Sequence, residues 1–314
     1  MAEVVLEEYR AWLHDSVSDF VRVWCPDAGH RRYEMARAEF VRRTTDDDAS
    51  RRYASTCPVP GVDHTLYRLR VVTLPSGASV LAGIHFRGQA TDYPFVGVFA
   101  QSRWFEAEEV AAAHAALLGE FAVFSPRATR WWSPVDRAAP QLAKVTPDQY
   151  LVMGLVDEIR SAPAVPLPHG WRLRRIEAAS EVALAFAELY SDFHHARPDL
   201  APAVPATTSE ELAECSRSGA LYACFSGSRL AGAVAAKPSA EYGVDAWLMW
   251  DIVLARAHCG KGLGPVLQRA VLDRLDSARA PLVAGTIDAR NLPSLRTALR
   301  VGRRVVGTWL FLAA

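Results

Sequence analysis

A hydrophobic segment that runs into a glycine-rich loop constrains this chain more than any other stretch of its sequence. Trp247–Ala255 reads as a strand, glycines occupy positions 260, 262 and 264, and an amphipathic helix is expected over Leu263–Ser277. Glycine lets the backbone approach a ligand without a Cβ in the way. The first turn of a helix offers unpaired N–H groups and the positive end of the helix dipole. A strand, a glycine-rich turn and a helix in this order therefore predict a site for a phosphate group.

Two other nucleotide-binding patterns fit this loop less well. A dinucleotide-binding fingerprint needs GxGxxG and a later acidic residue after a strand, whereas the loop reads GxGxG and lacks a well-placed acid. The GxxxxGK[ST] pattern of P-loop proteins is absent. A glycine-rich turn that binds no ligand remains the structural alternative.

The order of predicted elements suggests a tandem of related domains. The first part of the chain reads αα-βββ-α-β, and the part from Trp171 onward reads β-αα-βββ-α-β-α-β. The shared order predicts an α/β protein with two domains, each a mixed central sheet flanked by helices. The expected boundaries are a domain over 1–136, a linker over 137–169 and a domain over 170–314. A general likeness among mixed α/β folds is the alternative.

Two shorter predictions concern the segments around the domains. The linker is expected to contain a helix over Pro147–Ser161, inside a stretch with several prolines. Asp46 to Asp48 and the stretch Pro58-Val59-Pro60-Gly61 are expected to form loops.

Composition excludes several classes of protein. With 314 residues, 50% of them hydrophobic and 22% charged, the chain can bury two ordinary cores. Lysine plus arginine equals aspartate plus glutamate at 35 each, so a nucleic-acid partner is not expected. The N-terminus has no basic and apolar signal pattern, and no apolar run reaches about 18 residues, so neither secretion nor a membrane partner is expected. The five scattered cysteines lack a CxxC pair, which favours a cytoplasmic location and no metal site.

Two motifs in the second half resemble those of the GNAT (GCN5-related) N-acyltransferases. The glycine-rich loop is similar to the family's pyrophosphate loop, Gln/Arg-x-x-Gly-x-Gly/Ala, with Gly262 and Gly264 matching and Cys259 standing where Gln or Arg is usual. The order of elements over 171–314 also fits the family. A tandem arrangement with a degenerate N-terminal half is what the resemblance implies for the whole chain.

The second motif begins after the next predicted strand. Asn291 and Gly302 match the family pattern Asn-x-x-Ala-x-x-x-Tyr-x-x-x-Gly-Phe, and Ser294 occupies its small position. The resemblance implies that an acyl-CoA, acetyl-CoA or another thioester, binds here as co-substrate. The residues it assigns to the coenzyme are Ile252, Val253, Leu254, Cys259, Gly260, Lys261, Gly262, Leu263, Gly264, Asn291 and Ser294.

The family chemistry is direct attack of an amine on the thioester, and the amine must first lose a proton. Asp251 lies at a strand position where many members carry an acidic residue, and its apolar neighbours are expected to raise its pKa. A salt-bridged or solvated carboxylate is the alternative. The tyrosine that protonates the thiolate falls at Ala298 and is absent, so Ser294 is expected to substitute, with Thr297 or water as alternatives.

The acceptor is expected to be a small-molecule amine. Candidates for contact with it are His194, His195, Tyr242 and Trp250, and for each a solvated or structural position is the alternative. In the first half, the corresponding segment has no glycine and three carboxylates within 106–109, so this half is expected to bind no coenzyme.

The sequence therefore predicts an N-acyltransferase, monomeric or homodimeric, that moves an acyl group, acetyl in the first instance, onto a small amine. A role in secondary metabolism or resistance is a further hypothesis. Two alternatives stay open: an aminoacyl-tRNA-dependent transferase on the same fold, and a catalytically inactive coenzyme A-binding module.

Overall fold

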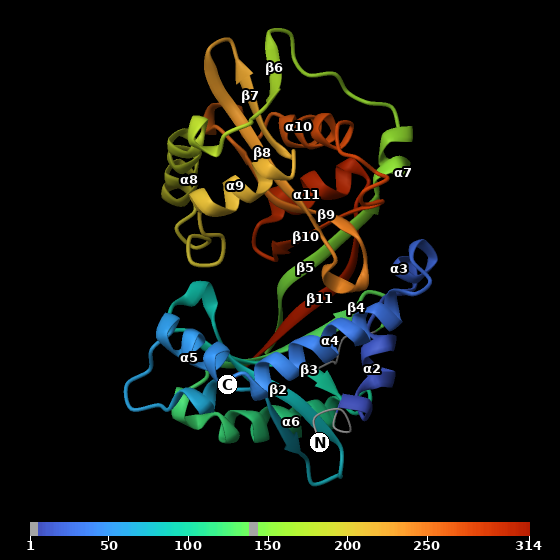
Figure 1. The fold of residues 1–314 in the computed structure, drawn as a ribbon, viewed down its shortest axis with the longest axis vertical. Helices are drawn as coiled ribbons and strands as arrows, with labels where there is room; N and C mark the ends of the chain where they lie inside the picture. The colour runs from blue at the N-terminus through green and yellow to red at the C-terminus, as the bar shows by residue number, and fades with distance from the viewer. Residues whose placement is uncertain (1–5, 138–143) are drawn as a thin grey trace. The chain divides into compact units, whose positions relative to one another are not determined.

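A computed structural model describes residues 6–137 and 144–314 of the chain, which divide into two compact units. The first unit comprises residues 1–150 together with 306–314, and the second comprises 151–305. Figure 1 labels the helices and strands of both units. Within the described residues, no helix combines the length and the apolar character needed to cross a bilayer.

The first unit is built mainly from the N-terminal half of the sequence. Its helices are α2 (Arg10–Asp15), α3 (Asp19–Trp24), α4 (Ala28–Thr45), α5 (Asp47–Thr56) and α6 (Ala107–Glu120). Its strands are β1 (Arg70–Thr73), β2 (Ser79–Phe86), β3 (Pro94–Gln101), β4 (Ala128–Pro134), the start of β5 (Val145–Leu155) and most of β11 (Arg304–Ala313).

The second unit contains the end of β5 and the elements that follow it. Its helices are α7 (Val156–Ser161), α8 (Ala183–Ala196), α9 (Ser209–Arg217), α10 (Leu263–Leu272) and α11 (Leu292–Val301). Its strands are β6 (Trp171–Arg175), β7 (Leu221–Ser226), β8 (Arg229–Ser239), β9 (Ala246–Leu254) and β10 (Leu282–Asp288).

The sheet of the first unit runs in the order β1-β2-β3-β4-β11. Strands β1, β2 and β3 are antiparallel, α6 forms the crossover, and β4 then pairs parallel to β3. The last strand of the chain, β11, completes this sheet by pairing antiparallel to β4, from Gly307 opposite Pro134 to Ala313 opposite Ala128. Helix α6 packs through Val110, Ala113 and Leu117 against the side chains of β2.

The second unit repeats the same arrangement. Its sheet runs β5-β10-β9-β8-β7-β6, with β6 to β9 antiparallel and β10 parallel to β9 after the crossover helix α10. Both units therefore contain antiparallel strands, a crossover helix and a parallel strand. The predicted fold class, α/β with mixed central sheets flanked by helices, is confirmed.

Alternate residues of β8 supply the two cores of the second unit, as the two-residue period of a strand requires. Ala233 and Ala235 face α8 and α9, where Phe186 and Leu212 pack. Their neighbours Val234 and Ala236 face the opposite side, where Leu267 and Val271 of α10 pack.

Two sequence predictions about secondary structure are wrong. The helix expected over Pro147–Ser161 is a strand up to Leu155, and only Val156–Ser161 is helical. Asp47 and Asp48, expected to be loop, form the first turn of α5, whose N-cap Asp46 accepts a hydrogen bond from the N–H of Ala49 at 2.9 Å. The predicted linker, 137–169, thus contains β5 and α7, and its residues 138–143 lie outside the described part of the chain.

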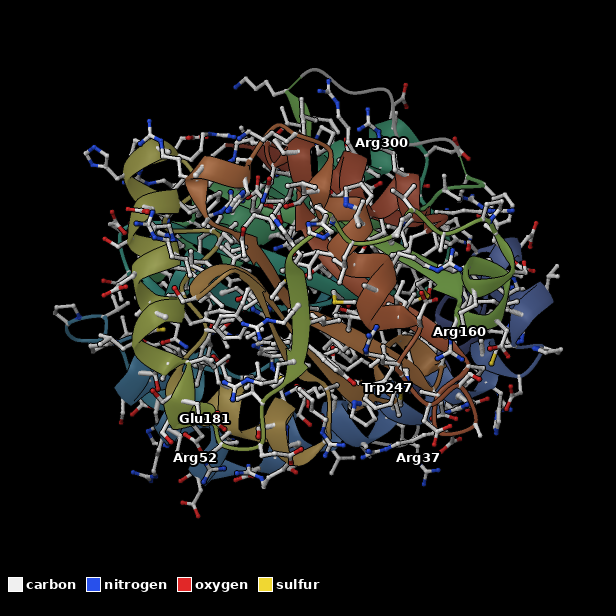
Figure 2. The ribbon with its side chains drawn as sticks, turned by 90° about the horizontal axis from the view of Figure 1, so that it is seen from above. Arg37, Arg52, Arg160, Glu181, Trp247 and Arg300 are labelled. Atoms are coloured by element: carbon white, nitrogen blue, oxygen red, sulfur yellow. The ribbon has the colours of Figure 1, made fainter. Side chains whose placement is uncertain are left out.

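Helix α10 ends at Leu272 rather than at Ser277, and carbonyl groups at and after its end accept hydrogen bonds from side chains of other elements. Arg160 of α7 donates through Nη2 to the carbonyl of Leu272 at 2.8 Å and also to that of Leu275. The indole of Trp247 donates to the carbonyl of Asp276 at 2.9 Å. Figure 2 labels Arg160 and Trp247 among the side chains of this region.

Candidate functional site

A cleft opens in the second unit where two parallel strands separate. Strands β9 and β10 pair only from Ala246 opposite Leu282 to Leu248 opposite Ala284. Both strands then continue, β9 to Leu254 and β10 to Asp288, without further pairing to each other. The cleft between them has a volume of about 140 Å³. Its lining comprises Tyr190, Phe193, Val204, Met249, Trp250, Asp251, Ile252, Val253, Gln268, Gly285, Thr286, Ile287, Asp288, Asn291, Ser294 and Arg303.

A β-bulge at Trp250 determines which way Asp251 points. The register with β8 shifts there, since Ala235 pairs with Asp251 and the next residue, Ala236, pairs with Met249. An extra residue in one strand exchanges the faces on which the following side chains lie. Before the bulge, Met249 packs in the core on the α10 side, whereas after it Val253 packs in the core on the α8 side. Asp251 consequently faces α8.

Asp251 is buried and accepts hydrogen bonds from two hydroxyl groups. Its side chain accepts from Tyr190 Oη at 2.5 Å and from the hydroxyl of Thr207. Burial raises its pKa to about 6, although both hydroxyls and the backbone N–H of Ile252 act in the opposite direction. Burial and the neighbouring carboxylate raise the pKa of Tyr190 well above its ordinary value, so its hydroxyl keeps its proton. The pair places a carboxylate that titrates near neutral pH in the cleft.

The glycine-rich loop leads from the end of β9 to an open helix N-terminus. Gly260 and Gly262 adopt φ angles of 73° and 74°, the left-handed region in which a side chain is strained, and no atom lies near the position of a Cβ on either. Gly262 is the N-cap of α10, and no side chain caps this helix. The first N–H groups of α10 are therefore available to an external acceptor.

Gly264 has a different role from the other loop glycines. A Cβ on Gly264 would lie 2.8 Å from Thr297 Oγ1, so its lack of a side chain permits α10 and α11 to pack closely. Thr297 thus faces α10, and it is not among the residues that line the cleft. Asn291, the N-cap of α11, accepts a hydrogen bond from the N–H of Ser294 at 3.4 Å while lining the cleft.

The corresponding helix of the first unit has a closed N-terminus. At the start of α6, the carboxylate of Glu109 accepts a hydrogen bond from the N–H of Glu106 at 3.3 Å and pairs with Arg103. Glu108 adds a further negative charge to the first turn. These carboxylates occupy the place where an anion would bind and would repel a diphosphate.

The structure brings together only part of the set of residues predicted from the sequence. Asp251, Trp250, Ile252, Val253, Asn291 and Ser294 line the cleft, whereas Leu254, Cys259, Gly260, Lys261, Gly262, Leu263 and Gly264 lie beyond it, along the end of β9 and the start of α10. Their assignment to a coenzyme stays a prediction. Among the residues that the structure describes, no three His, Cys, Asp or Glu side chains converge to hold a metal ion.

Three predicted acceptor residues do not line the cleft. His194 is hydrogen-bonded through Nε2 to the carbonyl of Val204 at 2.8 Å, and His195 is exposed on α8. Tyr242 belongs to the turn before β9. Their contact with an acceptor likewise stays a prediction.

Four further residues that line or support the cleft, Tyr190, Thr207, Gln268 and Arg303, are not among the site residues predicted from the sequence. Tyr190 and Thr207 reach Asp251 from α8 and from the loop before α9. Gln268 of α10 is buried in the cleft, and its Oε1 has no hydrogen-bond partner among the residues that the structure describes. Arg303 follows directly after Gly302, where the motif quoted above has phenylalanine, and it lies buried in the lining. No local pattern marks Tyr190, Thr207 or Gln268, because tertiary contacts alone bring them to the cleft, whereas the motif position of Arg303 is visible in the sequence.

The comparison with solved structures identifies the fold. A GCN5-related N-acetyltransferase from Sphaerobacter thermophilus matches with a TM-score of 0.53, over 88% of this chain and 90% of that chain, at 14% sequence identity. The chain has the GNAT fold. This confirms the sequence resemblance at the level of the fold.

Two further solved structures match at lower scores. A tandem GNAT protein from the clavulanic acid biosynthesis pathway matches over 76% of this chain and 78% of that chain, with 16% identity and a TM-score of 0.47. A GCN5-related N-acetyltransferase from Kribbella flavida matches over 78% and 89%, with 16% identity and a TM-score of 0.46. No protein-family model matches the sequence, and no curated protein matches it.

Proposed function

We propose that the second unit is an N-acyltransferase that moves an acyl group, acetyl in the simplest case, from an acyl-CoA to the amine of a small molecule. One observation carries the proposal. The second unit contains a cleft between the separating strands β9 and β10, with a buried carboxylate in its wall. The loop that follows β9 leads to the N-terminus of α10, which no side chain of the described residues caps.

The pyrophosphate and the pantetheine arm of coenzyme A would bind in chemically different places. The pyrophosphate would accept hydrogen bonds from the N–H groups at the start of α10, where the glycines leave the backbone open. The pantetheine arm carries amide N–H groups and would follow β9 into the cleft. Gln268 Oε1, buried without a partner, would accept from such an N–H, because an unsatisfied buried acceptor is costly.

Asp251 would act as the base. An amine that enters as an ammonium ion transfers one proton to the Asp251 carboxylate, and its nitrogen lone pair then attacks the thioester carbon. The new C–N bond forms as the C–S bond breaks, and the thiolate of coenzyme A leaves. The second proton of the attacking nitrogen passes through water to that thiolate, which gives a neutral amide and a free thiol. A base with a pKa of about 6 is largely unprotonated at pH 7, which suits this step.

The thiolate would leave without a tyrosine to protonate it. Ser294 is the α11 hydroxyl that lines the cleft, and it would donate a hydrogen bond to the leaving sulfur. A thiol has an ordinary pKa of about 8.5, so a hydrogen bond and a proton from water suffice near neutral pH. Thr297 is a less suitable donor, because it packs against Gly264.

A thiol-release assay tests the proposal. Full-length protein is incubated with acetyl-CoA and a panel of small amines, and free coenzyme A is measured against a control without amine. Amine-dependent release that is lost in Asp251→Asn supports the transferase. Coenzyme A binding with no release for any amine favours an inactive binding module, and no binding at all favours a donor of another class, such as an aminoacyl-tRNA.

A further inference from the structure

Within residues 6–137 and 144–314, no acidic side chain pairs with a buried arginine of the cleft. Arg303 is 3% exposed, and its Nη2 donates to the carbonyl of Val152 on β5 at 3.0 Å. Its Nε is buried without any hydrogen-bond partner. Burial lowers the pKa of the guanidinium to about 9, so it remains charged at neutral pH. The described residues thus leave a positive charge in the wall of the cleft that no carboxylate offsets.

The guanidinium lies where the two strands separate. A Cβ on Gly285 would come within 2.8 Å of Arg303 Nη2, so the absence of a side chain there makes room for the charged group. Gly285 directly follows Ala284, the last residue of β10 that pairs with β9. The charge is therefore at the closed end of the cleft rather than at the start of α10, where the diphosphate is expected.

The acids that share this cleft already have other partners. Asp251 accepts from Tyr190 and Thr207, and Asp288 pairs with Arg290 at 2.9 Å. An unpaired charge in a buried position is strongly unfavourable, which is why such groups are found with a counter-ion. A negatively charged ligand would supply a counter-ion for Arg303.

The free edge of the guanidinium favours a carboxylate. Nη2 donates one of its two N–H groups to Val152, and among the described residues Nε–H has no acceptor, so both nitrogens retain an N–H group for a ligand. Two parallel N–H donors match the two oxygens of one carboxylate. A neutral carbonyl would satisfy only one donor and would leave the charge uncompensated.

We infer that this cleft recognises a carboxylate group on one of its two reactants and holds it at Arg303. The inference rests on the proposed transferase function and specifies its substrate class. The carboxylate would belong either to the acyl group, as in the half-thioester of a dicarboxylic acid, or to the acceptor, as in an amino acid.

Two comparisons separate these sources. In the first, calorimetry gives the dissociation constants of succinyl-CoA and acetyl-CoA for the wild type and Arg303→Met. In the second, thiol release from acetyl-CoA is measured with a panel of amino acids and with their methyl esters. We expect a preference on the order of tenfold or more for the carboxylate in one comparison, and its loss in Arg303→Met.

Two further variants keep the test independent of folding. Arg300→Met removes the same charge from an exposed position at the end of α11, and should leave the preference intact. Gly285→Ala keeps the arginine but displaces its guanidinium, and should weaken the preference. Methionine has a length similar to that of arginine, and an apolar replacement for a buried unpaired charge should not unfold the unit.

The inference is overturned if neither comparison shows a preference for the carboxylate, or if the preference survives in Arg303→Met. It is also overturned if Arg303→Met slows acetyl transfer to esters as much as to amino acids, which would indicate a role in the reaction itself. Failure of the transferase proposal is distinguishable, because wild-type protein would then release no thiol with any amine, whether or not it binds coenzyme A. Direct titration with succinate would still test the arginine site in that case.

Discussion

Tyr190 and Asp251 lie 61 residues apart in sequence and share a buried hydrogen bond of 2.5 Å between the tyrosine hydroxyl and the carboxylate Oδ1. The bond exists because the bulge at Trp250 turns Asp251 toward α8. The hydrogen bond stabilises the charged carboxylate and so lowers the pKa of Asp251, whereas burial raises that pKa. The balance between the two leaves the pKa of Asp251 at about 6.

Tyr190→Phe should move the pH dependence of the reaction to higher pH. The hydrogen bond lowers the pKa of Asp251, so removing it raises that pKa further above its ordinary value. A base works in its deprotonated form, so wild-type kcat should rise as the pH increases through about 6. In the variant, the same rise should occur at higher pH, as measured by a pH profile of kcat.

Tyr222→Phe is the matched control for that experiment. Tyr222 is a buried tyrosine on β7 that packs in the core on the α10 side, whereas Asp251 faces α8. Its pH profile should coincide with that of the wild type. A shift in both variants, or in neither, would mean that Tyr190 does not set the pKa of the base.

Asp251→Asn should reduce activity and alter how stability depends on pH. The folded pKa of Asp251, about 6, exceeds its ordinary value of 3.8, so the folded state binds this proton more tightly than the unfolded state. Its stabilising contribution is complete below about pH 4 and is lost as the pH rises through about 6. Asp251→Asn has no carboxyl group at this position and therefore does not lose stability in this way as the pH rises.

Urea unfolding at several pH values measures the effect. Relative to the wild type, Asp251→Asn should gain on the order of 2 kcal/mol in unfolding free energy between pH 4 and pH 8. Its kcat should fall by about 10²-fold or more, as expected for loss of a general base. If the unfolding free energies of the two proteins changed with pH in parallel, burial would not raise the pKa of Asp251 in the folded protein.

Gly264→Ala should destabilise the second unit by about 1–2 kcal/mol, because overpacking outweighs the better helix propensity of alanine. The added Cβ would lie 2.8 Å from Thr297 Oγ1. Adding Thr297→Ala should restore most of the loss, giving a coupling energy between the two sites. Thermal unfolding of both single variants and of the double variant measures that coupling. Additive effects would contradict the close contact between α10 and α11.

The local features of the candidate site could be predicted from the sequence. The segment 251–264 shows its strand, loop and helix through hydrophobic periodicity and through glycine placement, both of which are local properties. The partners of Asp251 could not be predicted, since Tyr190 and Thr207 come from separate segments and meet the carboxylate only after a bulge has reversed its direction.

The two errors in secondary structure have different causes. In β5, the apolar run 150–153 fits a buried strand or a helix equally well, and pairing beside β10 decides between them. In α5, the aspartates at 46–48 suggested a loop, yet they are the N-cap and the acidic first turn of a helix. The same three aspartates also fit the start of a helix, so this local pattern does not distinguish the two structures.

Titration calorimetry of coenzyme A into the full chain tests the central claim most directly. Four proteins suffice: the wild type, Gly262→Asp, Gly262→Asn and Gly227→Asp, the last carrying the same residue at a comparable positive φ in the β7–β8 turn. We predict binding by the wild type, loss in Gly262→Asp through charge repulsion, a smaller loss in Gly262→Asn, and no change in Gly227→Asp. Equal affinity for coenzyme A in the wild type and Gly262→Asp would contradict a diphosphate site at the start of α10.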